Sequence, residues 1–273
     1  MVTGAAGRIG AFFARQAHER YDLRLLVQAG QDAGELAGCG EVVAGDLADL
    51  GGMKLACAGI DTVLHLAASP DPSAPWAVLL ADNIVGCYHA FVAARTAGCR
   101  RVVFASSIHA VSGYPPDVQV KTGEPVNPGD LYGVSKCFGE ALGRYMAEQE
   151  GLSVIAVRIG AFQPRAAARA GQGVPLLDAF ISRRDLVQLL CRAIDVPDLR
   201  FAIVHGLSDN RFKRLDLSDA RALLGYQPQD DATELDPALR ALHLRDTVRS
   251  HDQRGGGQRS GIRDELDEPE REA

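Results

Sequence analysis

Three glycines within the first ten residues place the strongest constraint on the fold of this chain. Gly4, Gly7 and Gly10 precede a helix-like stretch over residues 11–19. A glycine-rich turn between a strand and a helix lets the backbone approach a pyrophosphate and directs helix N–H groups toward it. The spacing GxxGxxG is one residue looser than the GxGxxG fingerprint, and a plain turn in an alanine-rich loop would also suit it. We favour dinucleotide binding by this loop, which comprises Gly4, Gly7, Arg8, Ile9 and Gly10.

Strand-like and helix-like segments alternate after the glycine loop. This alternation predicts an α/β fold, a Rossmann-type doubly wound parallel sheet with helices on both faces. We expect one NAD(P)-binding domain over residues 1–235, whose loops at 160–215 form a small C-terminal substrate-binding portion. The predicted strands are residues 23–28, 41–44, 62–67, 101–106 and 153–159.

The first strand is unusually short. Only Met1 and Val2 precede the loop, whereas a strand has about five to six residues on average. Either the numbered start is internal to the natural gene, or the central strand is truncated. The second alternative would weaken both cofactor binding and stability.

Composition excludes several classes of protein. The 273 residues are 47% apolar and carry a net charge of −6 without a long basic patch, so nucleic acid is not an expected partner. The six cysteines occur singly, which predicts reduced thiols in a cytoplasmic protein. Charges or glycine interrupt the apolar runs, so we expect no membrane span and no membrane partner. No metal site is expected.

The C-terminal segment differs in composition from the rest. From Asp246 onward, 28 residues contain eight acidic, five basic and only four apolar side chains, together with three consecutive glycines. Such a segment cannot bury enough surface to order itself. We expect residues 236–273 to form a flexible, disordered acidic tail without chemistry of its own.

The residues after the third and fourth predicted strands suit a cofactor pocket. Asp46 and Leu47 follow the third strand, and Leu66, Ala67 and Ala68 follow the fourth, where small side chains leave room for a ribose. An acidic residue that would select NAD over NADP is expected about 20 residues beyond the loop. The chain has the sequence Leu-Val-Gln-Ala at residues 26–29 instead. We expect NAD as the cofactor and leave NADP open.

Tyr132 and Lys136 stand four residues apart at the start of an amphipathic helix that extends to about residue 150. Residues at i and i+4 share one helical face. A nearby ammonium favours the phenolate, so it would move the pKa of the phenol toward the working range of an acid–base catalyst. The pair alone is more often a solvated lysine beside a half-buried ring. A second feature, in the preceding strand, favours the catalytic interpretation.

That feature is a pair of hydroxyls at the end of the strand over residues 101–106. Ser106 and Ser107 lie at the carboxyl end of a predicted parallel strand, which is where ligands bind in open α/β sheets. Ser107 is expected to donate to the substrate oxygen and Ser106 to face the nicotinamide. His109 is a candidate substrate contact.

Together these motifs resemble the extended short-chain dehydrogenases, the NAD-dependent epimerase/dehydratase family, over about residues 1–235. The segments VVFASS (102–107), LYGVSKCFGE (131–140) and VRIG (157–160) look most like uronate dehydrogenases, which oxidise a hexuronate to its lactone with NAD. The resemblance implies a catalytic triad of Ser107, Tyr132 and Lys136. It also implies cofactor contacts from Asp46, Leu47, Leu66, Ala67, Ala68, Asn83, Ser106, Tyr132, Lys136 and Ile159, and a substrate contact from Ser69.

The substrate side matches this resemblance less well. The family has asparagine where Ile108 stands and serine where Ala161 stands, and our alignment puts Pro175 where the family has a carboxylate-binding arginine. Arg165 or Arg169 could substitute, because bidentate carboxylate recognition needs an arginine.

Two rival functions remain at this stage. A nucleotide-sugar epimerase or dehydratase would share the cofactor and the Tyr-Lys pair, but the chain after residue 159 is short. A non-catalytic dinucleotide-binding protein would explain the short first strand. We further expect a homodimer through the helices over residues 83–97 and 132–150. Their outer faces are predicted to carry Val85, Tyr88, Phe91, Phe138, Leu142 and Tyr145.

Overall fold

A computed structural model describes residues 1–169, 178–236, 239 and 262 of the chain. The side chains of residues 168 and 169 are outside this description. The expected tail over residues 236–273 falls almost entirely outside it as well.

The strands and helices alternate as predicted. The strands are β1 (Val2–Thr3), β2 (Arg24–Val27), β3 (Glu41–Ala44), β4 (Thr62–His65), β5 (Arg101–Ser107), β6 (Ser153–Ile159), β7 (Ala161–Gln163), β8 (Phe180–Ser182) and β9 (Phe201–Gly206). The α-helices are α1 (Arg8–Ala17), α2 (Leu50–Ala56), α3 (Trp76–Val78), α4 (Gly86–Thr96), α5 (Leu131–Glu148), α6 (Arg165–Arg169), α7 (Arg183–Asp195), α8 (Ser218–Leu224) and α9 (Ala232–Leu235). Short 3-10 helices are η1 (Gly34–Leu36) and η3 (Ile108–Val111), and η2 (Leu79–Val85) is a π-helix.

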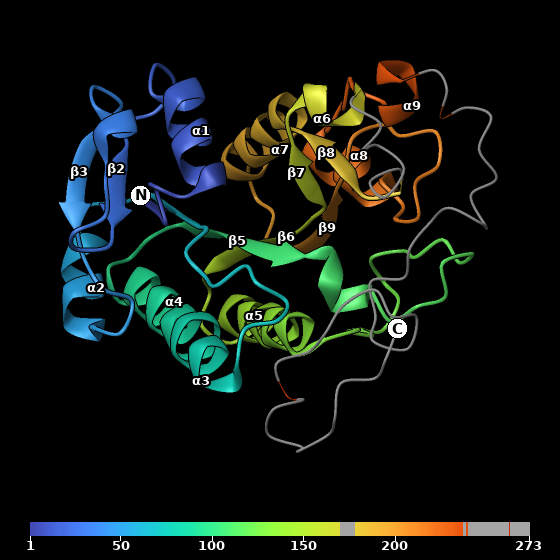
Figure 1. The fold of residues 1–273 in the computed structure, drawn as a ribbon. Coiled ribbons are helices and arrows are strands. Elements are labelled where there is room, and N and C mark those ends of the chain that lie inside the picture. Colours follow the sequence, from blue (N-terminus) through green and yellow to red (C-terminus); the bar gives the residue numbers. More distant parts are fainter. Residues whose placement is uncertain (170–177, 237–238, 240–261, 263–273) are drawn as a thin grey trace.

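Within the described residues, seven strands form a parallel sheet in the order β3-β2-β1-β4-β5-β6-β9 (Figure 1). The first six follow the Rossmann order. The two-residue β1 pairs with both β2 and β4, so the short first strand still occupies the centre of the sheet. The strand β9, which sequence reasoning did not predict, pairs with β6 at the edge.

Two apolar clusters cover the two faces of the sheet. Side chains of α1, α7 and α8 pack on one face, and those of α2, α4 and α5 pack on the other (Figure 1). Every residue of β5 is buried, as is typical of a parallel strand covered on both faces. The carboxyl ends of β1, β4 and β5 therefore meet at one edge of a rigid layer.

Glycines bring α5 close to the sheet. A Cβ on Gly139 would lie 2.2 Å from Phe104 Cζ, and one on Gly143 would lie 2.8 Å from Val154 Cγ1. At the first turn, a Cβ on Gly133 would lie 2.3 Å from the His109 carbonyl oxygen. The helix can pack at this depth only because these positions lack side chains.

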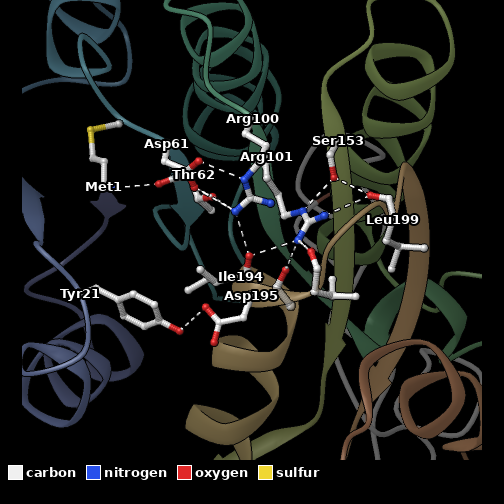
Figure 2. A network of polar contacts seen from close by, with 12 residues as sticks. Met1, Tyr21, Asp61, Thr62, Arg100, Arg101, Ser153, Ile194, Asp195 and Leu199 are labelled. Atoms are coloured by element: carbon white, nitrogen blue, oxygen red, sulfur yellow. Dashed lines mark hydrogen bonds and ion pairs between the residues drawn. The ribbon is translucent and has the colours of Figure 1, made fainter.

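The opposite edge of the sheet, at the amino ends of the strands, contains a network built on two arginines (Figure 2). Arg101 is 1% exposed and donates to the Ser153 hydroxyl and to four backbone carbonyls that follow or end α7. Burial lowers the pKa of Arg101 to about 10. Arg100 forms a bidentate pair with Asp61 at 2.9 and 3.0 Å and also donates to the Ile194 carbonyl. Cations at a helix C-terminus satisfy its free carbonyls and oppose the helix dipole.

The predicted apolar outer surface of the helices is partly confirmed. Val85, Tyr88 and Tyr145 are exposed. The assignment of Phe91 to this surface is wrong, because Phe91 is fully buried against the sheet, where it contacts Phe104. The stretch Trp76–Thr96 is also long and apolar enough to cross a membrane by length and composition, contrary to our reading of the apolar runs. Its α4 part packs on the sheet as a core helix.

Candidate functional site

The glycine loop closes tightly over the carboxyl ends of β1 and β4. Gly4 has φ +65°, and a Cβ there would lie 2.8 Å from the Ala67 backbone nitrogen. A Cβ on Gly10 would lie 2.4 Å from the Gly4 carbonyl oxygen. Gly7 is the N-cap of α1. Side chains at these positions would open the turn and fill the space in front of the helix N-terminus.

Thr3 and His65 join this loop to β4. The Thr3 hydroxyl accepts from the backbone N–H groups of Leu66 and Ala67, both at 3.2 Å, and lies 2.8 Å from His65 Nδ1. A hydroxyl that accepts twice has its one proton left for Nδ1, so the proton of His65 lies on Nε2. Burial lowers the pKa of His65 to about 3, which keeps the ring neutral. Sequence reasoning did not predict this contact, although Thr3 directly precedes Gly4 and His65 directly precedes Leu66.

A cavity of about 240 Å³ lies in front of the loop. Gln28 and Gln31 also line it, so neutral amides stand where an acidic residue would select NAD. Of the predicted cofactor residues, seven line this cavity: Gly4, Gly7, Asp46, Leu47, Leu66, Ala67 and Ala68.

Other predicted cofactor residues lie elsewhere. Arg8 is exposed and donates to the Phe162 carbonyl of β7 at 3.2 Å, and Ile9 packs against the core. Ile159 is a buried core residue at the end of β6. Asn83 is buried, accepts from Ser69 N at 2.8 Å and donates to the Ser135 hydroxyl at 2.9 Å. Asn83 thus connects the loop after β4 to α5.

Tyr132, Lys136 and Ser107 come together where β5 ends and α5 begins. Lys136 Nζ donates to the Ala105 carbonyl at 2.9 Å and lies 5.5 Å from the Tyr132 ring centroid. Both side chains are almost fully buried, and Ser107 forms a hydrogen bond with Tyr132. The helical spacing thus places the phenol and the ammonium near each other on α5, and the end of β5 adds the Ser107 hydroxyl.

The electrostatics of this group differ from the sequence-based expectation. Burial raises the pKa of Tyr132 to about 12, against the effect of its hydrogen bond with Ser107, and the charge of Asp130 raises it further. Burial lowers the pKa of Lys136 to about 8. We expected the ammonium to favour the phenolate, but desolvation dominates here because it disfavours the charged form of both groups.

Ser106 lies in a different environment from Ser107. Its hydroxyl donates to Glu140 Oε1 at 2.6 Å. Arg158 binds both oxygens of Glu140 at 2.8 Å, and His205 lies 3.5 Å from Arg158. All four side chains are buried. Ser106 is thus part of a buried polar network rather than an open hydroxyl, which speaks against its predicted role at the nicotinamide.

His109 lies beside the Tyr132 ring. The ring centroids are 5.3 Å apart in an edge-on arrangement, and His109 Nδ1 is 2.7 Å from Asp130 Oδ2. Asp130 is also the N-cap of α5 and accepts from Gly133 N at 2.7 Å. Sequence reasoning did not single out Asp130. The available signal is an acidic residue just before a helical motif, which indicates a helix cap rather than a site residue.

One of the two candidate arginines of the substrate loop, Arg165, is paired with a residue outside this group. Arg165 pairs with Asp230, Nε to Oδ1 at 3.2 Å, and is half exposed. The side chain of Arg169 and residue 175 lie outside the described residues. Arg214, which sequence reasoning did not single out, is mostly buried and lines a small cavity of about 10 Å³ together with Ile108, Ser112 and Asp178.

The strand order and the glycine loop define a dinucleotide-binding α/β protein. The chain belongs to the NAD dependent epimerase/dehydratase family, whose model matches residues 1–164. The NAD-dependent glucose-6-phosphate dehydrogenase of Haloferax volcanii is 36% identical over 86% of this chain and 94% of that protein. The uronate dehydrogenase of Pseudomonas putida is 32% identical over 88% and 87%.

A solved structure has a similar fold. A Tyr-to-Ala mutant of the uronate dehydrogenase from Agrobacterium tumefaciens, complexed with NAD, is 33% identical, covers 90% of this chain and 88% of its own, and has a TM-score of 0.76. The residues of this chain fit that cofactor, since the glycines let the turn close tightly before the N-terminus of α1 and two of them line a cavity of about 240 Å³.

Proposed function

We propose that this protein is an NAD-dependent dehydrogenase that oxidises the anomeric carbon of a sugar or sugar acid, with a hexuronate as substrate and its lactone as product. The observation that carries the proposal is the buried group of Tyr132, Lys136 and Ser107 at the carboxyl end of β5, on the same edge of the sheet as the glycine-loop cavity. Its relatives named above act on a sugar phosphate and on uronates.

Each residue of the group has a role in this reaction. The Ser107 hydroxyl donates to the substrate oxygen and holds it near Tyr132. Tyr132 takes the proton of the anomeric hydroxyl while the carbon loses its hydride and becomes a carbonyl. It does so as a phenolate, a form that burial disfavours and that a neighbouring cation favours. Lys136 stabilises that phenolate. When bound, the nicotinamide supplies the hydride acceptor.

The substrate charge needs a cation. A carboxylate that enters the pocket unpaired costs several kcal/mol. Arg165 pairs with Asp230. We assign the carboxylate contact to Arg214, which lines a small cavity with Ile108 and donates to the Ser112 and Tyr114 carbonyls. Arg214→Leu is expected to raise KM for D-glucuronate by about tenfold or more, as for a charge-assisted hydrogen bond. Arg165→Leu is expected to leave it unchanged.

The experiment is an assay of NAD reduction with D-glucuronate, D-galacturonate, D-glucose 6-phosphate, D-glucose and UDP-glucose. We expect the uronates to be oxidised fastest and UDP-glucose not to react. Turnover of UDP-glucose would favour a nucleotide-sugar enzyme. Binding of NAD without oxidation of any of these sugars would favour a non-catalytic protein.

We further propose a cytoplasmic homodimer that assembles through η2, α4 and α5. The apolar side chains Val85, Tyr88, Val134 and Tyr145 are exposed on these helices. Burial of such a surface against its own copy is the usual arrangement in symmetric dimers. Light scattering at micromolar concentration is expected to give twice the chain mass, and a monomer would contradict the proposal.

A further inference from the structure

His109 and Asp130 form a hydrogen-bonded pair next to Tyr132. The His109 backbone N–H donates to Ser107 Oγ at 3.2 Å, and a side chain at Gly133 would collide with its carbonyl. These two contacts hold the backbone of His109 in place between β5 and α5. Its side chain is 13% exposed, whereas that of Asp130 is fully buried.

Both oxygens of Asp130 have a defined donor. Oδ1 accepts from Gly133 N and Oδ2 faces His109 Nδ1, each at 2.7 Å. A carboxylate can only accept, so Nδ1 carries a proton. In a neutral imidazole the other nitrogen, Nε2, then presents a lone pair.

We propose that Asp130 is a positioning residue that fixes His109 as the Nδ1–H tautomer, so that Nε2 accepts a hydrogen bond from a hydroxyl of the sugar bound beside Tyr132. The substrate class is then a sugar with a free hydroxyl next to the carbon that is oxidised. This inference rests on the proposed function and adds a specificity element to it.

Helix capping alone does not require this arrangement. Asparagine caps a helix about as well as aspartate, and Asp231, the N-cap of α9, binds only Thr233 in its own first turn. Asp130 directs its second oxygen across to η3 instead. The difference between the two caps provides a matched control.

Asp130→Asn tests the tautomer directly. The amide oxygen can still accept from Gly133 N, which leaves the NH₂ group facing His109 Nδ1 and requires that nitrogen to accept. Imidazole ¹⁵N chemical shifts of His109 at neutral pH are expected to show Nδ1–H in the wild type and Nε2–H in the variant. Asp231→Asn is expected to leave them unchanged. An Nε2–H ring or an imidazolium in the wild type would overturn the inference.

Kinetics test the consequence for the substrate. Asp130→Asn is expected to raise KM for D-glucuronate by about ten- to a hundredfold, with a smaller fall in kcat, because an acceptor becomes a donor. In a His109→Phe background the same substitution should have little further effect. The wild type should discriminate against 2-deoxy-D-glucose relative to D-glucose, and Asp130→Asn should lose this discrimination.

The two proposals fail in different ways. If no sugar is oxidised, the proposed function fails, and so does the substrate part of this inference, whereas the ¹⁵N shifts still decide whether Asp130 fixes the ring. If sugars are oxidised but Asp130→Asn changes neither the tautomer nor KM, only this inference is overturned. If Asp130→Asn raised KM in the His109→Phe background by as much as in the wild type, this inference would also be overturned.

Discussion

Each of the two edges of the sheet contains a buried cation, and the two cations differ in the number of hydrogen bonds that they make. At the amino ends, Arg101 has five acceptors, four of them backbone carbonyls. At the carboxyl ends, Lys136 is as deeply buried, but among the described residues it donates only to the Ala105 carbonyl. Burial lowers the pKa of both cations. The two edges differ in how many hydrogen bonds the buried cation makes, and a buried cation with few acceptors is typical of a reactive site, as we propose for the carboxyl edge.

The largest expected effect is on turnover at the carboxyl edge. Tyr132→Phe removes the proton carrier and leaves the packing of the ring, so kcat should fall by about 10²- to 10⁴-fold. NAD affinity by calorimetry and the melting temperature should stay near the wild-type values. Retention of more than a few per cent of the wild-type turnover would refute the role of this phenol.

At the amino edge the expected effect is on stability instead. Arg101→Met removes the buried donor shared by Ser153 and four carbonyls. The Ile194 and Leu199 carbonyls keep donors from Arg100 and Ser153, whereas those of Ala193 and Val196 lose theirs. The free energy of unfolding should therefore fall by about 3 kcal/mol. Urea denaturation measures this loss. Activity of the folded enzyme at 25 °C should remain within about twofold of wild type. A large loss of kcat in a fully folded sample would contradict the assignment of the amino edge to stability and the carboxyl edge to activity.

Lys136→Met should affect activity rather than stability, the reverse of Arg101→Met. It should weaken both turnover and NAD binding, because the ammonium serves the phenol and the cofactor. It should not lower stability at neutral pH, since it removes a charge that burial disfavours.

The pH dependence sharpens this expectation. The pKa of Lys136 is about 8 in the folded protein and about 10.4 in an unfolded chain. Between these values the unfolded state binds more protons, so the contribution of Lys136 to stability rises with pH. The stability difference, wild type minus Lys136→Met, should rise by up to about 3 kcal/mol between pH 7 and 10.5. A flat difference would show that the ammonium is not desolvated.

The smallest effect is expected for the exposed neighbour of Arg101. Arg100 and Asp61 have side chains that are 44% and 65% exposed. Such pairs contribute about 0–1 kcal/mol. Arg100→Met should therefore lower the free energy of unfolding by less than about 1 kcal/mol in the same urea titration. A loss as large as that of Arg101→Met would mean that burial does not separate the two arginines.

Sequence reasoning was most reliable where spacing along one element decides the geometry. The i, i+4 relation of Tyr132 and Lys136 and the buried run of β5 led directly to the observed group. Contacts between distant segments were not accessible in this way. Arg165 pairs with Asp230 across 65 positions, and Asp130 reaches His109 from another element. Arg101 would be taken for a surface residue, because its acceptors follow a helix about 90 residues later.

Face assignments were a further limit. Phe91 and Tyr88 are both apolar residues of α4, but only the first contacts the sheet. Ser106 and Ser107 are neighbours whose side chains leave a strand on opposite sides, so one joins Glu140 and the other Tyr132. Sequence composition alone does not predict which face of a helix, or which side of a strand end, a given side chain occupies.

The glycines of α5 have a consequence for attempts to redesign this protein. Gly133, Gly139 and Gly143 set the distance between the helix and the sheet, and the same helix holds the phenol and the ammonium. A methyl group at any of them would therefore displace both reactive groups together, as a rigid unit. Libraries aimed at new sugars should keep these three positions constant and vary cavity-lining side chains outside α5, such as Ile108.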